Sequence, residues 1–154
     1  VIYLRSDIYP AVNGGPTLRT MSKTYYSEIN LHVTWHTKDN SPLITPMIEA
    51  DLYAYLKDRI VTTEGAFFHG IGGIEDHLHI GVSVAPKIHL DEWLGQLKGS
   101  SSHEFGSAIS WQRGYGVVSF GTKDLRWVLS YIQDQKQRHR DRDIYERLER
   151  IGQE

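Results

Sequence analysis

The sequence contains no cysteine, which excludes disulfide bonds, a thiolate zinc site and a cysteine nucleophile. It has no apolar run long enough to span a bilayer, and its first residues lack the charged-then-apolar pattern of a secretory signal peptide. A chain without cysteine is compatible with a reducing compartment, so we expect a cytoplasmic protein.

The sequence also lacks a strong excess of charge of either sign. Its 17 Lys and Arg oppose 19 Asp and Glu, giving a net charge of -2. Bulk charge therefore does not indicate a nucleic-acid partner, although a local basic patch could still bind one. The 154 residues are 40% apolar and 23% charged, which is the balance of a globular protein and the length of one domain.

The first twenty residues differ from the rest of the sequence. They contain two prolines and a Gly-Gly pair without a sustained hydrophobic period, and organised sequence begins just after Met21. We interpret residues 1–20 as a leader or an added extension, the alternative being a short functional arm. Residues 21–154 are expected to form a single domain.

Hydrophobic periodicity predicts seven elements in the order β-α-β-β-α-β-α. The expected strands are 29–36, 66–71, 77–84 and 117–120, and the expected helices are 46–62, 90–105 and one that begins after Thr122. Gly72-Gly73 is predicted to be a turn, and the charged segment after Arg138 a solvated helix or tail. This order predicts an α+β, ferredoxin-like (RRM-like) fold: an antiparallel sheet with helices on one face and an additional C-terminal helix.

Two histidines stand out in the third strand. His77 and His79 are separated by one residue, so both side chains point to the same face, close enough to share one cation. His32 and His36 are expected on that face too, which should be open because the helices cover the apolar face. A pair of surface histidines remains the alternative for such a short pattern.

The last helix carries a second candidate pair. Tyr131 and Gln135 are four residues apart and therefore share a helix face. Tyr131 could be an ordinary tyrosine at the margin of the core, or a nucleophile whose target phosphate is polarised by a metal ion. Two imidazoles and an amide oxygen would leave coordination positions open for that phosphate.

Five short blocks, taken in order, resemble the single-tyrosine HUH transposases of insertion sequences, relatives of the REP-associated tyrosine transposases. His77-Leu78-His79 is similar to the HUH motif, and Tyr131 to Gln135 is similar to the tyrosine helix. The blocks lie within Leu31 to Ile151 and are 32–38, 72–79, 97–102, 111–116 and 131–135. Close relatives often carry His-His after the glutamine, where this sequence has Arg138-His139, a change that we expect to leave the chemistry intact.

The resemblance implies a bacterial or archaeal DNA transposase that acts at the nucleoid. Tyr131 would attack a phosphodiester in single-stranded DNA, form a 5′-phosphotyrosine and free a 3′-hydroxyl that later rejoins strands. His77, His79 and Gln135 would hold one divalent metal, Mg2+ or Mn2+. The expected partners are DNA hairpins at the element ends and a second copy of the chain in a homodimer, with active sites that can be shared between subunits.

Several other residues are candidates for supporting roles. Lys98, Arg113, Lys38 and Arg138 could contact phosphates, with Lys123 and Arg126 as further cations, and an ordinary solvated cation is the alternative for each. His32 and His36 are expected to support the metal site, the alternative for either being an ordinary surface histidine with its hydrogen bonds satisfied. Trp111 and Tyr115 could stack on bases, or serve packing or a dimer interface.

Two rival functions belong to other classes. The segment Arg113 to Phe120 nearly fits the RNP1 pattern of RNA-recognition domains, which would make the protein a non-catalytic RNA-binding module. Val117 stands where RNP1 requires an aromatic residue, and the segment is predicted to be the fourth strand instead of the third. A domesticated transposase that binds hairpins without cutting them is the other alternative, and metal dependence separates the enzyme from both.

Overall fold

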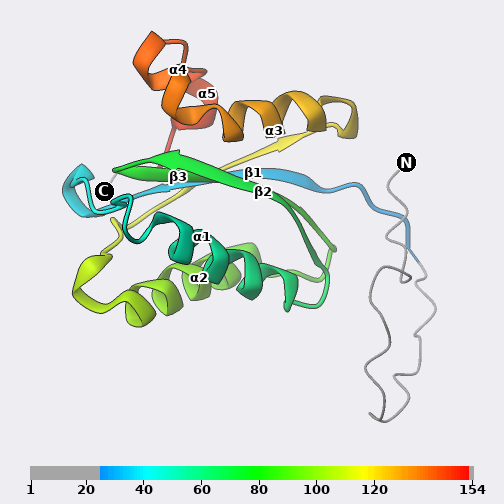
Figure 1. Ribbon diagram of the computed structural model, residues 1–154. Helices are drawn as coiled ribbons and strands as arrows, with labels where there is room; N and C mark the ends of the chain where they lie inside the picture. The colour runs from blue at the N-terminus through cyan, green and yellow to red at the C-terminus, as the bar shows by residue number, and fades with distance from the viewer. Residues whose placement is uncertain (1–24, 153–154) are drawn as a thin grey trace.

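The strand Asn30–His36 (β1) follows from strict alternation of apolar and polar residues, and it lies near the centre of the structure (Figure 1). The computed structural model describes residues 25–152. The other elements are α1 (Glu49–Val61), β2 (Ala66–Ile74), β3 (His77–Val84), α2 (Leu90–Phe105), β4 (Gly116–Phe120), α3 (Leu125–Gln133), α4 (Gln135–Asp141) and α5 (Glu146–Glu149), with 3-10 turns η1 (Lys38–Asn40), η2 (Gly106–Ala108) and η3 (Thr122–Asp124).

The sheet has the order β2-β3-β1-β4, and its paired strands are all antiparallel. In the register of β1 and β3, His36 pairs with His77 and Thr34 with His79. This order and the mixed helix and strand content confirm the predicted α+β fold. The RNP1-like segment forms the edge strand β4, the fourth along the chain.

One face of the sheet forms the main hydrophobic core with α1 and α2 (Figure 1). Leu31, Val33 and Trp35 point into it from β1, and each exposes at most 4% of its surface. Helix α1 contributes Leu52 and Leu56 at helical spacing, both fully buried. Burial of this apolar stripe fixes which side chains of β1 and β3 must point to the opposite face.

The opposite face of the sheet is covered by α3, α4 and α5, so the expectation of an open face is wrong (Figure 1). Val128 and Ile132 of α3 and Leu148 of α5 are buried there. His32 and His79, which were expected to line an open surface, are fully buried. The charged segment after Arg138 was predicted to be solvated because its charge density is high, but Leu148 within it is buried.

Two glycines allow this second layer to lie against the sheet. The predicted turn at Gly72-Gly73 is instead the end of strand β2, and the turn falls at Glu75 and Asp76. A Cβ atom at Gly72 would lie 2.1 Å from the carbonyl oxygen of Ile132, and one at Gly116 would lie 1.9 Å from that of Arg150. Glycine is therefore required here for close backbone approach and not for chain reversal.

Changing Gly72 to alanine is expected to destabilise the fold by about 3 kcal/mol or more, because the new methyl group must displace the backbone of α3. Gly99→Ala is the matched control: no atom lies within 4 Å of the added Cβ, and alanine in a helix should add about 0.5–1 kcal/mol of stability. Urea unfolding of both variants measures the difference. Equal stability of Gly72→Ala and the parent chain would contradict the close contact.

Candidate active site

His77 and His79 present their Nε2 atoms to one buried space on the α3 side of the sheet. The Nδ1 atom of His77 contacts Oδ1 of Asp76 at 2.6 Å, and Nδ1 of His79 contacts Nε2 of His32 at 2.9 Å. Both Nε2 atoms are buried without a hydrogen-bond partner. Partners that engage Nδ1 and leave Nε2 free are the arrangement typical of metal-binding histidines.

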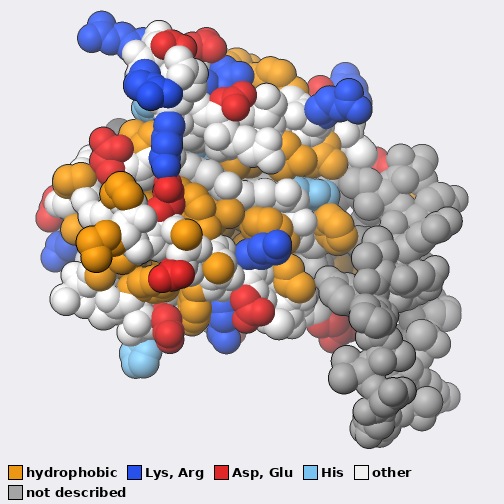
Figure 2. Space-filling model, viewed as in Figure 1, with side chains coloured by type: hydrophobic (Ala, Val, Ile, Leu, Met, Phe, Trp, Pro, Cys, Tyr) orange, Lys and Arg blue, Asp and Glu red, His pale blue; other side chains and the backbone are white. Residues whose placement is uncertain are grey.

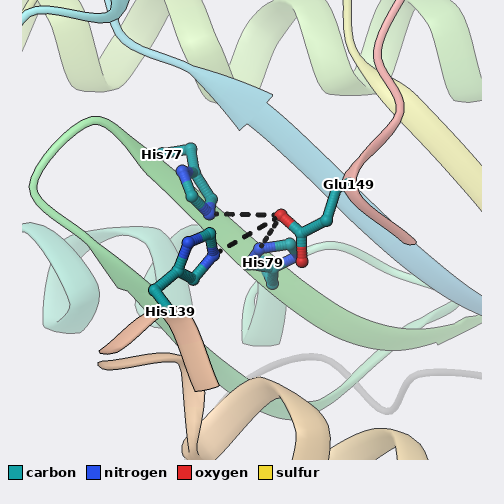
Figure 3. Close-up of side chains that lie close together, drawn as sticks. All are labelled: His77, His79, His139 and Glu149. Carbon is teal, nitrogen blue, oxygen red and sulfur yellow. Dashed lines mark ion pairs between the residues drawn. The ribbon is translucent and has the colours of Figure 1, made fainter. Parts of the chain in front are cut away.

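The carboxylate of Glu149 lies between these histidines (Figure 3). Its Oε2 atom is 3.4 Å from Nε2 of His77, 3.4 Å from Nε2 of His79 and 3.7 Å from Nε2 of His139. One atom from each of these four residues falls within 4.8 Å of the others, close enough to bind one metal ion. The site thus collects side chains from β3, α4 and α5.

Tyr131 is fully buried beside the same cluster. Its hydroxyl donates a hydrogen bond to the carboxylate of Glu149 and accepts one at 3.0 Å from the backbone N–H of Tyr145. Its ring centroid lies 6.0 Å from that of His79. The hydroxyl therefore points into the site and not to water, so the interpretation of Tyr131 as a residue at the margin of the core is wrong.

Gln135 is buried one turn after Tyr131, as the i to i+4 spacing predicted. The two residues do not share one uninterrupted helix: α3 ends at Gln133, Asp134 departs from helical geometry, and α4 begins at Gln135. The Nε2 atom of Gln135 donates to the carbonyl of Tyr131 at 3.1 Å, and its Oε1 atom is buried without a partner. A buried, unpartnered amide oxygen is available to a ligand.

The two histidines expected to support the site both contact it. His32 lies behind His79, with ring centroids 5.0 Å apart. The ring of His36 stacks on that of His77 at 4.9 Å, and its Nδ1 atom is 2.7 Å from Oδ1 of Asn40. These contacts fix the orientation of the imidazoles of His77 and His79, and a supporting role remains our prediction.

The candidate phosphate contacts are not gathered in one place. Arg138 lies 5.0 Å above the ring of Tyr131 and pairs with Asp143 at 2.8 Å, so it is beside the site. Lys98 is on α2, below the other face of the sheet, where its ammonium donates to the carbonyls of Gln112 and Gly114. Lys38 and Arg113 line a shared hollow near η1. The structure thus brings only Arg138 of these four to the histidines, and the DNA contacts remain predictions.

The two aromatic residues proposed for stacking are used within the fold. The ring of Trp111 packs edge-on against Trp35 at 5.9 Å, and its Nε1 atom donates to Ser101. The hydroxyl of Tyr115 donates to Asp91 at 2.9 Å. These contacts favour the packing interpretation of both residues.

The pKa values of Tyr131, Glu149 and His77 are shifted from their ordinary values in different directions. Burial and the hydrogen bond to Glu149 raise the pKa of Tyr131 to about 12. Burial alone would raise the pKa of Glu149 and lower that of His77, but their contact reverses both: the carboxyl pKa is lowered and the imidazole pKa is raised, with Asp76 assisting. At neutral pH the carboxylate of Glu149 is therefore charged and the phenol of Tyr131 is neutral.

Comparison with known proteins places the chain in a family. A family model described as IS200-like transposase matches residues 25–135. The chain belongs to the IS200-like transposase family. The match includes Tyr131, Gln135 and the His77-Leu78-His79 motif, and it ends before His139 and Glu149.

Two solved structures share the fold of this family member. One, from Deinococcus radiodurans R1 and described as a candidate transposase, has a TM-score of 0.59 and 20% identity, over 73% of this chain and 95% of that one. The other, a REP-associated tyrosine transposase bound to a REP hairpin, has a TM-score of 0.58 and 18% identity, over 75% and 71% of the two chains. No curated protein matches the sequence. Among residues 25–152, no helix has the length and apolar character needed to cross a membrane.

Sequence reasoning missed His139 and Glu149 as members of the cluster. His139 had a signal: it follows Gln135 by four residues and so lies on the same helical face. Glu149 had none, because it is one of many charged residues in its segment and reaches the histidines only through the packing of α5. It exposes 14% of its side chain and His139 exposes 25%. The prediction that this segment is solvated is therefore wrong for Leu148 and Glu149.

The buried His32 should make stability depend on pH. Burial and the neighbouring His79 lower the pKa of His32 to about 3, so protons bind the unfolded chain first and stability falls as pH decreases below about 6.5. Between pH 7.5 and pH 5.5 this loss amounts to about 1.4 kcal/mol. His32→Asn should remove that part of the pH dependence, measured by urea unfolding in EDTA.

The matched change at His103, an exposed residue near the end of α2, serves as the control for the His32 experiment. His103→Asn should keep the pH dependence of the parent chain. An unchanged pH dependence in His32→Asn would show that His32 is not the buried neutral imidazole described here.

Proposed function

We propose that this chain is a single-tyrosine transposase that cuts and rejoins single-stranded DNA at element-end hairpins, with Tyr131 as the nucleophile. The observation that carries the proposal is the position of the Tyr131 hydroxyl, which is buried and directed at the carboxylate that also contacts His77 and His79. A phenol placed against a candidate metal cluster is suited to attack a phosphate that a metal ion polarises.

The proposed step transfers one phosphodiester linkage to the protein. The Oη atom of Tyr131 attacks the phosphorus, a P–Oη bond forms, and the bond from phosphorus to the 3′-oxygen breaks. The phenol loses its proton, and the departing 3′-oxygen gains one to become a hydroxyl. The energy of the cleaved ester is kept in the 5′-phosphotyrosine, so attack by a 3′-hydroxyl can rejoin strands without a nucleotide cofactor.

The residues present fit a divalent metal. His77, His79 and His139 each have a buried Nε2 atom with no hydrogen-bond partner, and Gln135 has such an Oε1 atom. We propose Mg2+ or Mn2+, held by His77, His79 and Gln135, with Glu149 and His139 as further donors; the oxygen donors suit both ions. When bound, the metal would polarise the phosphate and stabilise charge on the leaving oxygen.

The side chains around Tyr131 have separate tasks in this proposal. Asp76 and His32 hold the imidazoles of His77 and His79 so that their Nε2 atoms face the carboxylate of Glu149, where the metal would bind. Burial and the contact with Glu149 oppose ionisation of Tyr131, and a cation held by Glu149 would offset part of that opposition. Arg138 supplies a cation beside the ring, where it can pair with the DNA backbone.

The proposed partners are hairpin DNA and a second copy of the chain. One structural neighbour is bound to a REP hairpin, which supports a hairpin substrate for this family member. We propose a homodimer whose active sites can be shared between subunits, on the basis of the sequence resemblance. Within the described chain, α3 packs on the chain's own sheet, with the rings of Tyr131 and His79 6.0 Å apart. A DNA substrate would place the enzyme at the nucleoid of a bacterial or archaeal cell.

A covalent-trapping assay tests the proposal. The protein is mixed with labelled single-stranded oligonucleotides that carry a hairpin and unpaired flanks, in Mg2+, Mn2+ or EDTA. A denaturation-resistant protein–DNA band that requires metal would support the transposase. Binding without any adduct would favour a domesticated hairpin-binding protein, and a preference for RNA without an adduct would favour the RNA-binding module.

A further inference from the structure

An exposed indole stacks directly on the ring of Tyr131. Trp127 is one helical turn before Tyr131 on α3, and the two ring centroids are 5.7 Å apart with an interplanar angle of 22°. The ring of Tyr145 meets Trp127 edge-on at 5.5 Å. Trp127 exposes 47% of its surface and Tyr145 exposes 49%, whereas Tyr131 exposes none. The aromatic stack therefore runs from the buried ring of Tyr131 to the exposed rings of Trp127 and Tyr145 at the protein surface.

The exposure of Trp127 is unusual for this chain. Among the described residues, Trp35 and Trp93 are buried in the core, and Trp111 is half-buried against Trp35. Burial of a large aromatic side chain is favourable in free energy, and an exposed indole does not obtain that stabilisation. An exposed indole beside a functional site therefore indicates a binding surface. Ile144, with 44% exposure, extends this apolar patch next to Tyr145.

The charges around Trp127 favour a polyanion over an apolar protein partner. Arg126 precedes it in the chain and is exposed, and Arg138 lies over the ring of Tyr131. At the top of the space-filling view, over α4, Lys and Arg side chains are prominent, with Asp and Glu side chains among them (Figure 2). A flat aromatic face next to cations is the combination with which proteins bind unpaired nucleotides: the ring takes the base and the cation takes the phosphate.

We propose that Trp127, in contact with Tyr145, is a stacking platform for an unpaired base next to the phosphate that Tyr131 attacks. This inference rests on the proposed function and adds a specificity element to it. Because a base in a duplex has both faces covered by its neighbours, the platform admits only unpaired DNA. It does not read base identity, because every base has an aromatic face.

Tryptophan fluorescence tests the platform. Titration with a hairpin oligonucleotide that carries unpaired flanks should quench emission of the wild-type protein, and Trp127→Phe should lose that quenching. Anisotropy of the labelled oligonucleotide should show affinity lower by on the order of tenfold to a hundredfold for Trp127→Ala, with a smaller loss for Trp127→Phe. Trp111→Phe is the matched control: it removes an indole on the α2 side of the sheet and should retain both quenching and affinity.

The covalent-trapping assay, run on the same variants, separates this inference from the proposed function. Adduct formation with unchanged affinity and no quenching at Trp127 would overturn the platform alone. Quenching and weakened binding by Trp127→Ala, without any adduct, would support the platform and overturn the strand-cutting proposal. If Trp127→Ala instead abolished self-association in light scattering and left oligonucleotide affinity intact, the patch would be a contact between copies and the platform would be wrong.

Discussion

Replacing Tyr131 with phenylalanine is expected to abolish the covalent protein–DNA adduct, lowering its yield by about a thousandfold or more. The change removes only the oxygen that would attack phosphorus and leaves the ring between its neighbours. Because the hydroxyl bonds with Glu149 and with the N–H of Tyr145, its loss should also cost about 1–3 kcal/mol of stability. Quantitative trapping, together with urea unfolding to confirm that the variant is folded, measures both effects.

Tyr115→Phe is the control for this experiment because it also removes a phenol that donates to a carboxylate, but below the other face of the sheet. It should form the adduct at the rate of the parent chain. An adduct that persists in Tyr131→Phe would assign the nucleophile to another side chain and would remove the main support for strand transfer through Tyr131.

Loss of either His77 or His79 is expected to weaken Mn2+ binding by about a hundredfold or more, as measured by isothermal titration calorimetry. Each supplies an unpartnered Nε2 atom, and alanine leaves no donor in its place. Asp76→Asn, which alters only the partner of His77, should cause a smaller loss of about tenfold. Glu146→Gln, an exposed change in α5, is the control and should leave binding unchanged. Unaltered Mn2+ binding in both histidine variants would place the metal elsewhere.

The same titrations distinguish the oxygen donors. The family resemblance implies Gln135 as the third ligand, whereas the structure places the carboxylate of Glu149 against both histidines. If Gln135→Ala weakens Mn2+ binding and Glu149→Gln does not, the carboxylate only occupies the site in the absence of metal. A loss of about tenfold or more in Glu149→Gln would make Glu149 a ligand, because the substitution keeps an oxygen but removes its charge.

The regular part of the fold could be predicted from the sequence because each strand and helix carries its own period. The alternation in β1 and β3 sets which side chains face α1 and α2, and this assigns His32, His77 and His79 to the other face. The end of β2 could not be predicted, because Gly72 and Gly73 have the composition of a turn. Gly72 must be glycine because the backbone of Ile132, which is remote in sequence, lies against it, and Gly73 because the backbone of His77 and Leu78 in the paired strand lies against it.

The candidate site was predictable where its residues are local in sequence and not where they depend on packing. Two residues on one strand, or four apart on a helix, must share a face, so His77 with His79 and Tyr131 with Gln135 could be paired in advance. Glu149 reaches the histidines because α5 lies against β1 and β4, with Gly116 under the carbonyl of Arg150. Hydrophobic periodicity does not predict such a contact between remote segments. A charged residue in a charged segment also gives no indication that it is buried.

The position of β1 in the sheet also determines how long the nascent chain must wait for a paired strand. Its residues pair with residues of β4 that lie 82 to 90 positions later, from Thr34 with Gly116 to Asn30 with Phe120. At the usual 5–20 residues per second, a ribosome needs about 4 to 18 seconds to supply that partner after β1 is made. During this interval one edge of β1 has no strand beside it. Glu149 is synthesised later still, so the carboxylate is the last member of the cluster to be made and the histidines cannot surround it until almost the whole chain exists.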